Sequence, residues 1–158
     1  MPLKINDGYS IRKILSIVRD AIEYISDNQS SVWGTPELNI CHHLACELKK
    51  KFSDFDIDVE LIKDDRRRPD IVIHKRGNNE NNLVVFQVKI NPTSTDIKED
   101  LFKIEDTFFR APYSYKYGLF ISVGKLPNPL PEFDSSKIRF IQIYGWKVAK
   151  STSTDYKF

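Results

Sequence analysis

The sequence predicts an α/β domain in which a mixed β-sheet is flanked by helices. Two segments, 10–26 and 35–52, carry apolar residues at spacings of three and four, which is typical of helices. Apolar or alternating runs follow at 57–62, 70–75 and 83–90, and a helical pattern over 95–110 leads to a further apolar run. A hairpin meander followed by a helical crossover into another strand gives a mixed sheet with helices on its faces.

The N-terminal helices are predicted from their apolar faces and their end signals. The apolar face of the first helix consists of Ile11, Ile14, Leu15, Val18, Ala21, Ile22 and Ile25, and the polar residues 27–31 end it. In the second helix we expect Thr35 as the N-cap and Pro36 at the first helical position. Three lysines at 49–51 occupy its last turn, where cations complement the helix dipole.

The next three strands bring polar residues together. A first strand at 57–62 is followed by a charged turn at 64–68, and the turn-rich residues 77–81 join strands 70–75 and 83–90 as a hairpin. Pairing of His74 or Lys75 near Leu83 or Asn82 places Asp70 opposite Gln87. Because strand side chains alternate, Gln87 and Lys89 share one face, so we expect a polar cluster of Asp70, Gln87 and Lys89.

The rest of the chain completes the sheet. Residues 91–94 break the chain before helix 95–110, and the apolar strand 117–123 is expected at the centre of the sheet. A proline-rich loop at 126–132 precedes a strand at 138–144, and the tail after Lys150 is expected to fray. We therefore predict one domain over 1–158, with an N-terminal helical addition at 1–30, a core at 35–125, a loop and final strand at 126–150, and a tail at 151–158.

Composition excludes several classes of protein. The 24 basic and 22 acidic residues leave a net charge of +2, so a nucleic-acid surface has to come from local clustering of charge. The first residues do not form a signal peptide, and no apolar run approaches the ~20 residues that span a bilayer, which predicts no membrane association. Cys41 and Cys46 lie five residues apart on one predicted helix, a poor geometry for a disulfide, which favours a cytoplasmic location.

Two short motifs give the sequence a family resemblance. Pro69-Asp70 opens one predicted strand, Gln87-Val88-Lys89 lies on the next, and Glu37 follows Thr35-Pro36 at the start of the second helix. This arrangement over residues 35 to 125 resembles the PD-(D/E)xK nuclease superfamily. The resemblance implies the restriction-endonuclease-like fold, an α-β-β-β-α-β core, here with an extra N-terminal helix and a C-terminal strand. Gln87 departs from the pattern, because most members carry Glu or Asp there. Some families, including modification-dependent restriction endonucleases, work with Gln-x-Lys.

The resemblance implies hydrolysis of phosphodiester bonds, with DNA favoured over RNA. Glu37, Asp70, Gln87 and Lys89 are the implied catalytic residues. Asp70, Gln87 and Glu37 would hold Mg²⁺ or Mn²⁺, with low affinity because an amide is a neutral ligand. Lys89, beside carboxylates, stays protonated and would stabilise charge on the phosphate.

The resemblance also implies binding partners, but less specifically than it implies the activity. Arg66, Arg67 and Arg68 are the expected contacts to nucleic-acid phosphates. The chain carries no obvious specificity domain, so recognition of a particular target would need a homodimer or a partner subunit.

Other interpretations of the same residues stay open. The chain could be a catalytically degraded member of the fold that acts as a nucleic-acid-binding or protein-interaction module. It could instead be an unrelated α+β interaction domain in which Asp70 and Lys89 form a buried ion pair. Residue by residue, Asp70 could simply belong to a turn, Glu37 could complement the helix dipole, and Gln87 and Lys89 could point to solvent. Cys41, His42 and Cys46 suggest a zinc site, but no second Cys/His cluster completes it.

Overall fold

The protein is a mixed α/β structure built on one six-stranded sheet. The computed structural model describes residues 4–61 and 67–144 and the backbone of 147–152. The strands follow the chain across the sheet in the order β1 to β6. They are β1 (Asp56–Val59), β2 (Ile71–His74), β3 (Val84–Ile90), β4 (Tyr117–Val123), β5 (Ile138–Tyr144) and β6 (Lys147–Thr152). The central strands β3, β4 and β5 run parallel, and every other neighbouring pair is antiparallel.

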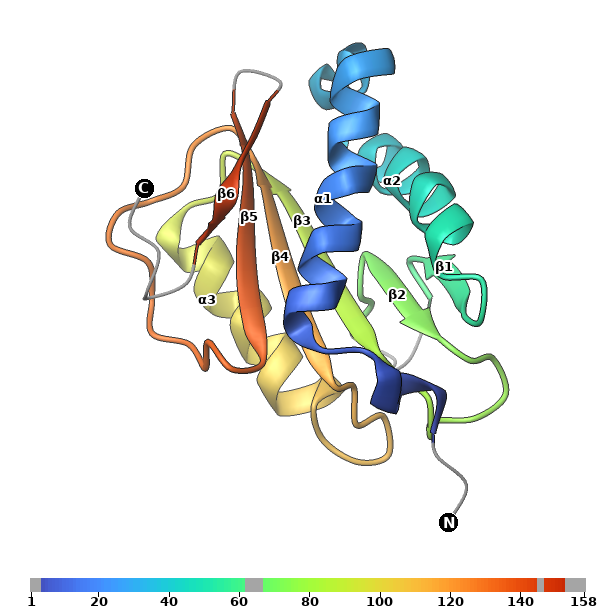
Figure 1. Ribbon diagram of the computed structural model, residues 1–158. Helices are drawn as coiled ribbons and strands as arrows, with labels where there is room; N and C mark the ends of the chain where they lie inside the picture. Colours follow the sequence, from blue (N-terminus) through green and yellow to red (C-terminus); the bar gives the residue numbers. More distant parts are fainter. Residues whose placement is uncertain (1–3, 62–66, 145–146, 153–158) are drawn as a thin grey trace.

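Helices cover both faces of the sheet (Figure 1). Helices α1 (Ile11–Asn28) and α2 (Glu37–Lys51) lie on one face, whereas α3 (Ser94–Lys103) lies on the other. A single π-helical turn, Ile104–Phe108, extends α3, and two short 3₁₀ helices, Ile5–Gly8 and Ser30–Gly34, precede α1 and α2. The predicted element order, with two N-terminal helices, three strands, a helix and two more strands, is therefore observed.

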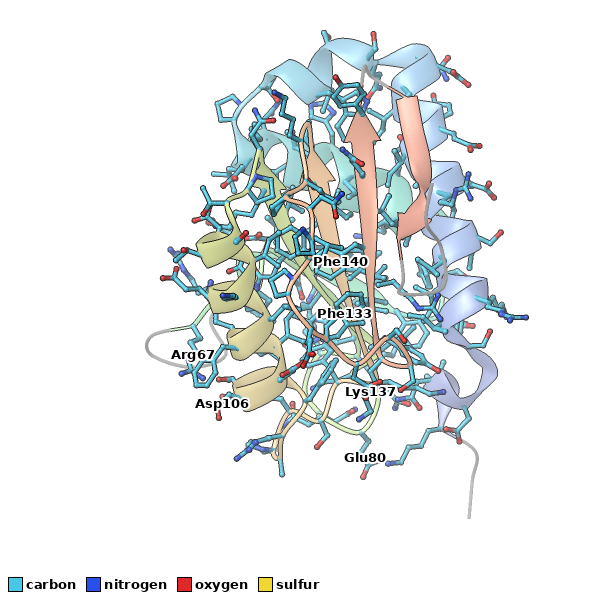
Figure 2. The ribbon with its side chains drawn as sticks, turned by 90° about the vertical axis from the view of Figure 1, so that its left-hand side faces the viewer. Arg67, Glu80, Asp106, Phe133, Lys137 and Phe140 are labelled. Atoms are coloured by element: carbon cyan, nitrogen blue, oxygen red, sulfur yellow. The ribbon has the colours of Figure 1, made fainter. Side chains whose placement is uncertain are left out.

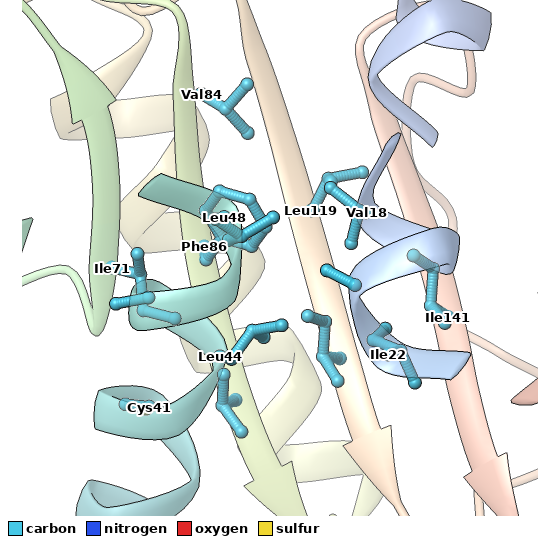
Figure 3. Packing of buried hydrophobic residues seen from close by; sticks show 14 of the residues in the cluster. Val18, Ile22, Cys41, Leu44, Leu48, Ile71, Val84, Phe86, Leu119 and Ile141 are labelled. Carbon is cyan, nitrogen blue, oxygen red and sulfur yellow. The ribbon is translucent and has the colours of Figure 1, made fainter. Parts of the chain in front are cut away.

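Two hydrophobic clusters, one on each face of the sheet, hold the layers together. Figure 3 shows the larger one, in which Val18 and Ile22 of α1 and Leu44 of α2 pack against Phe86 and Leu119 of the sheet. The smaller one packs α3 against Val72, Val85, Phe120 and Phe140. Alternation along each strand explains the division, because successive side chains go to opposite faces. The inner face of α3 and of the π-helical turn that extends it consists of four buried residues, Ile97, Leu101, Ile104 and Phe108.

Local capping fixes where two of the helices begin. Ser10 is the N-cap of α1, and its hydroxyl accepts the Lys13 N–H at 3.2 Å. Thr93 and Asp96 form a capping box at the start of α3. The prediction for α2 was wrong by one residue, because Pro36 occupies the N-cap and the helix begins at Glu37. Thr35 instead donates its hydroxyl to the carbonyl of Val32 at 2.6 Å.

The hairpin register agrees with the prediction. Ile71 pairs with Phe86 and Val72 with Val85, and the Asp70 N–H donates to the Phe86 carbonyl at 3.1 Å. One residue further, this register sets Asp70 beside Gln87. The predicted strands at 117–123 and 138–144 are β4 and β5.

Two strand predictions need correction. The first strand ends at Val59 and not at 62, and Ile62 itself lies outside the described residues. We expected the tail to fray after Lys150, but residues 151–152 belong to β6, which pairs antiparallel with β5. Residues 153–158 lie outside the described part of the chain. Of the helices in the described ranges, none is both long and apolar enough to cross a lipid bilayer.

Candidate functional site

The candidate site forms where β3 extends beyond its neighbour β2. The N–H groups of Val88 and Ile90 point toward this open edge. Asp70 Oδ2 accepts the Val88 N–H at 2.7 Å, and Glu37 Oε2 accepts the Ile90 N–H at 3.1 Å. Two residues along a strand span about 7 Å, so two carboxylates distant in sequence stand side by side on one strand edge.

Gln87 and Lys89 occupy the face of β3 that α3 covers. They share this face with Val85, which belongs to the cluster under α3. Gln87 is only 1% exposed, and its Nε2 has no hydrogen-bond partner among the described residues. The side chain of Lys89 is 32% exposed. The interpretation in which both side chains point to solvent is therefore wrong for Gln87, and Lys89 lies at the boundary between interior and solvent.

A third carboxylate, which the motifs do not include, enters the site from α3. Asp100 is 2% exposed. Its Oδ1 lies 3.0 Å from Lys103 Nζ, and its Oδ2 lies 3.9 Å from Lys89 Nζ. Within the described residues, the ion pair of Lys89 is thus with Asp100. This corrects the interpretation in which Asp70 and Lys89 form the buried pair.

Burial and neighbouring charges set the protonation of the site. Burial raises the pKa of Asp70 to about 6, against the hydrogen bond from Val88, and Asp100 raises it further while Lys89 and Lys103 lower it. Burial alone would lower the pKa of Lys89. The carboxylates of Asp100, Glu37, Asp70 and Asp96 outweigh burial and raise this pKa above its ordinary value. The ammonium of Lys89 therefore stays charged at neutral pH.

The donor set suits a hard cation only in part. Glu37 and Asp70 supply carboxylate oxygens at the edge of β3, and the Gln87 amide is buried on the α3-facing side of the same strand, with no partner for its Nε2 among the described residues. The Val88 carbonyl points to the same strand edge as its N–H. No group of three His, Cys, Asp or Glu side chains in the described part of the chain is placed to hold one metal ion. A cation here would thus be coordinated by two carboxylates at most, together with amide and carbonyl oxygens.

Of the three predicted arginine contacts, the two that are described pair with acids that do not belong to this cluster. Arg66 falls outside the described residues. The Arg67 guanidinium pairs with Asp106 at 2.9 Å, contacts the Thr107 hydroxyl and lies over the Phe102 ring at 5.2 Å. Figure 2 shows Arg67 and Asp106 together beside α3. Arg68 is exposed and lies 4.0 Å from Glu60, so its guanidinium makes fewer contacts than that of Arg67.

The cysteines and histidines of α2 do not form a zinc site. Cys41 is buried in the larger core cluster, whereas Cys46 is exposed, and both are free thiols. Burial, with Asp70 and Glu37 nearby, raises the pKa of Cys41 far above its ordinary value. The thiol therefore stays protonated and acts as a core side chain.

A hollow of about 460 Å³ lies at the carboxyl ends of the parallel strands. Trp33 and Thr35 line it on one side, and Ile90, Gly124 and Tyr144 line it on the other. Ile90 thus contributes its N–H to Glu37 and its side chain to this wall. None of the four predicted site residues lines the hollow, and Ile90 is its link to Glu37.

A second polar cluster, at the other end of β2, is already internally paired. His74 Nε2 lies 2.7 Å from Asp58 Oδ2, and Arg76 makes two further bonds to the Asp58 carboxylate. Hydrogen bonding from Arg76, aided by His74, lowers the pKa of Asp58 to about 2 despite burial. Because its members already bond to one another, we interpret this cluster as a structural link between β1 and β2.

Comparison of the chain with protein-family models, with curated proteins and with solved structures finds no match. The chemical role of the site is therefore inferred from its own side chains alone.

Sequence reasoning missed Asp100 and Lys103 as members of the site. A charged residue on an amphipathic helix is normally assigned to the solvent face. A signal was nevertheless present, because Asp100 follows Ile97 by three positions and precedes Ile104 by four. These spacings put the carboxylate on the buried side of α3.

Proposed function

We propose that this chain is a metal-dependent nuclease of the PD-(D/E)xK type with a restriction-endonuclease-like core, hydrolysing phosphodiester bonds in DNA in preference to RNA. The α-β-β-β-α-β order from α2 to β4 supports the proposed fold. The observation that carries the activity is the placement of Asp70 and Glu37 on successive outward N–H groups of β3, next to Lys89.

Asp70, Gln87 and Glu37, with the Val88 carbonyl, are the groups that would hold Mg²⁺ or Mn²⁺. When bound, a divalent cation supplies positive charge against the phosphate and promotes ionisation of water. Gln87 offers a neutral oxygen where a third acid would add charge, so low affinity for the cation is expected. Rotation of the amide exchanges its oxygen and nitrogen, which lets the buried end of Gln87 act as an acceptor.

Lys89 supplies fixed positive charge to the reaction. Its ammonium is held by carboxylates that keep it protonated, so it cannot act as a base at neutral pH. A charged donor at the rim of a low-dielectric site stabilises the negative charge that develops on a phosphate in the transition state. The side chain is partly exposed, which leaves the ammonium accessible to a substrate from solvent.

The experiment compares cleavage of supercoiled plasmid, a single-stranded DNA oligonucleotide and an RNA of the same sequence, with Mg²⁺, with Mn²⁺ and with EDTA. We expect metal-dependent cleavage that Lys89→Met lowers at least ~100-fold, since loss of one charge-stabilising donor has this effect. Lys98→Met is the matched control, because Lys98 is exposed on α3. A Lys89→Met protein that cleaves at the wild-type rate would refute the assignment.

A catalytically degraded module of the same fold is the second candidate. The observation that favours it is Gln87, a buried neutral amide in place of an acid, in a described structure without a group of three metal-binding side chains. Such a module binds nucleic acid or a protein and cleaves nothing with either metal. Recognition of a particular target would depend on a second copy of the chain or a partner subunit in both cases.

A further inference from the structure

We propose that Lys103 is a second phosphate-contacting cation of this site and that Asp100 is the positioning residue that holds Lys103 and Lys89 in place. The inference deepens the proposed function and rests on it for the nature of the substrate. It adds two residues of α3 to a site otherwise built from α2, β2 and β3.

One carboxylate joins the two lysines. Asp100 Oδ1 contacts Lys103 Nζ at 3.0 Å, while Oδ2 lies 3.9 Å from Lys89 Nζ. The lysines come from different layers, because Lys89 is the penultimate residue of β3 and Lys103 is the last residue of α3. An ordinary i, i+3 pair on a helix surface would involve Lys103 alone. The bridge across the layers fixes the two ammonium groups relative to each other.

Burial distinguishes Asp100 from a surface acid. Asp100 is 2% exposed, and its Oδ2 accepts no hydrogen bond in the described structure. Burial of a carboxylate is costly unless charged partners compensate. Lys89 and Lys103 are 32% and 31% exposed. The carboxylate thus lies behind the two ammonium groups, whose outer sides are open to a ligand from solvent.

The ligand that fits two such ammonium groups is a phosphodiester. Lysine acts as a point charge on phosphate oxygens, and its three N–H groups allow one ammonium to keep its carboxylate while it donates to a second anion. The Gln87 amide is buried on the same face of β3 as Lys89, with its Nε2 unpartnered among the described residues. The site therefore combines an acid edge for a cation with a lysine pair for the phosphate.

The first test measures binding of a single-stranded DNA oligonucleotide in EDTA as a function of salt. Each lysine–phosphate contact contributes about 0.7 to 0.9 to the slope of log K against log salt. Lys103→Met is expected to lower the slope by about one, Lys103→Arg to retain it, and Lys98→Met to leave it unchanged. Equal slopes for Lys103→Met and Lys98→Met overturn the role of Lys103.

The second test separates positioning from folding. Asp100→Asn keeps the shape but loses the charge that orients the ammonium groups, so we expect kcat to fall about 100-fold with KM within about threefold. Thermal melting of the same preparations establishes that the variant is folded. A kcat within twofold of the wild type, or a loss explained by the unfolded fraction, overturns the positioning role.

The two proposals fail in different ways. Binding in EDTA with the predicted slopes, but no cleavage with either metal, refutes the nuclease and leaves the Lys103 contact standing. Metal-dependent cleavage with no slope difference between Lys103→Met and Lys98→Met refutes the Lys103 contact and leaves the nuclease standing. Absence of any oligonucleotide binding in EDTA overturns the phosphate role of Lys103.

Discussion

Asp70 serves the backbone as well as the proposed chemistry. Its carboxylate accepts the Val88 N–H at 2.7 Å, at the point where β2 no longer covers the edge of β3. Without this acceptor, a nearly buried N–H group would lack a partner, which costs about 1–3 kcal/mol. The same burial makes the ionised carboxylate expensive, so Asp70 stabilises the fold best when it is neutral.

The stability of the protein should therefore fall as pH rises through the range where Asp70 ionises. Its pKa is raised from 3.8 to about 6 in the folded state, so the folded protein retains the proton longer than the unfolded chain does. The cost of this group grows as pH rises from about 4 to about 6, reaches on the order of 2–3 kcal/mol there, and persists at higher pH. We expect Asp70→Asn to melt higher than the wild type at pH 8 and equally at pH 4.

Asp96 provides a control of opposite sign. Hydrogen bonds from the N–H and hydroxyl of Thr93 lower the pKa of Asp96, so its charged form favours folding. Asp96→Asn should melt lower than the wild type at pH 8, and the difference should shrink as pH falls through the lowered pKa. An Asp70→Asn protein that melts lower than the wild type at pH 8 would contradict the assigned cost.

Gln87 decides between an active and a degraded site. Gln87→Glu adds a carboxylate beside Asp70, which should raise Mg²⁺ affinity at least tenfold in calorimetric titration if Glu37, Asp70 and position 87 share one cation. Asp70→Asn in the same titration should abolish binding. Unchanged Mg²⁺ affinity in Gln87→Glu would indicate that position 87 does not face a cation.

Among the elements, α3 connects the smaller core cluster to the site. Its first turn is held by the Thr93–Asp96 capping box, and Asp100 lies one turn further along. Thr93→Ala should destabilise the protein by about 1 kcal/mol in urea unfolding. Hydrogen exchange should increase in the first turn of α3, and proposed cleavage should fall because Asp100 loses a rigid support.

The matched variant for this prediction is Ser10→Ala. Ser10 caps α1, which packs on the opposite face of the sheet and carries none of the site residues. The stability loss should be similar, with cleavage unaffected after correction for folded protein. Equal effects of both variants on cleavage would argue against a link between the start of α3 and the site.

The accuracy of the sequence-based prediction varied from strand to strand for physical reasons. The central strands were predictable because strands buried on both faces read as continuous apolar runs. The last strand was not, because its sequence, KVAKST, lacks both an apolar run and a clear alternation. Its place is set by pairing with β5, which no local pattern reports.

Across the molecule, the sheet couples two cores that lie on opposite faces. Leu44 of α2 is fully buried in the larger cluster, and Leu101 of α3 is 5% exposed in the smaller one. Replacement of either by Ala should cost about 2–5 kcal/mol. Because both clusters contain side chains of β3 and β4, we expect one unfolding transition in each variant, by circular dichroism and by fluorescence. Two separate transitions in Leu101→Ala would show that α3 unfolds independently.

The candidate site was only partly predictable from sequence. Asp70, Gln87 and Lys89 came together because a hairpin register follows from its turn and its hydrophobic pattern. The contact of Glu37 with β3 depends on how α2 packs on the sheet, so a motif could suggest it but spacing could not. Asp100 belongs to another helix and another face, and only tertiary packing brings it to Lys89.

The acids on the edge of β3 and the lysine beside them would not be lost equally easily during evolution. Asp70 and Glu37 each accept a backbone N–H of β3, so selection for a folded protein alone would preserve an acceptor at both positions, for which the neutral amides Asn and Gln also suffice. The Lys89 ammonium donates no hydrogen bond to the backbone in the described structure, and after its loss Asp100 would keep its closer partner Lys103. In descendants that abandoned catalysis, Lys89 should drift first, whereas positions 70 and 37 should keep a side chain that accepts the strand N–H, so the lysine would be the more informative marker of an active lineage.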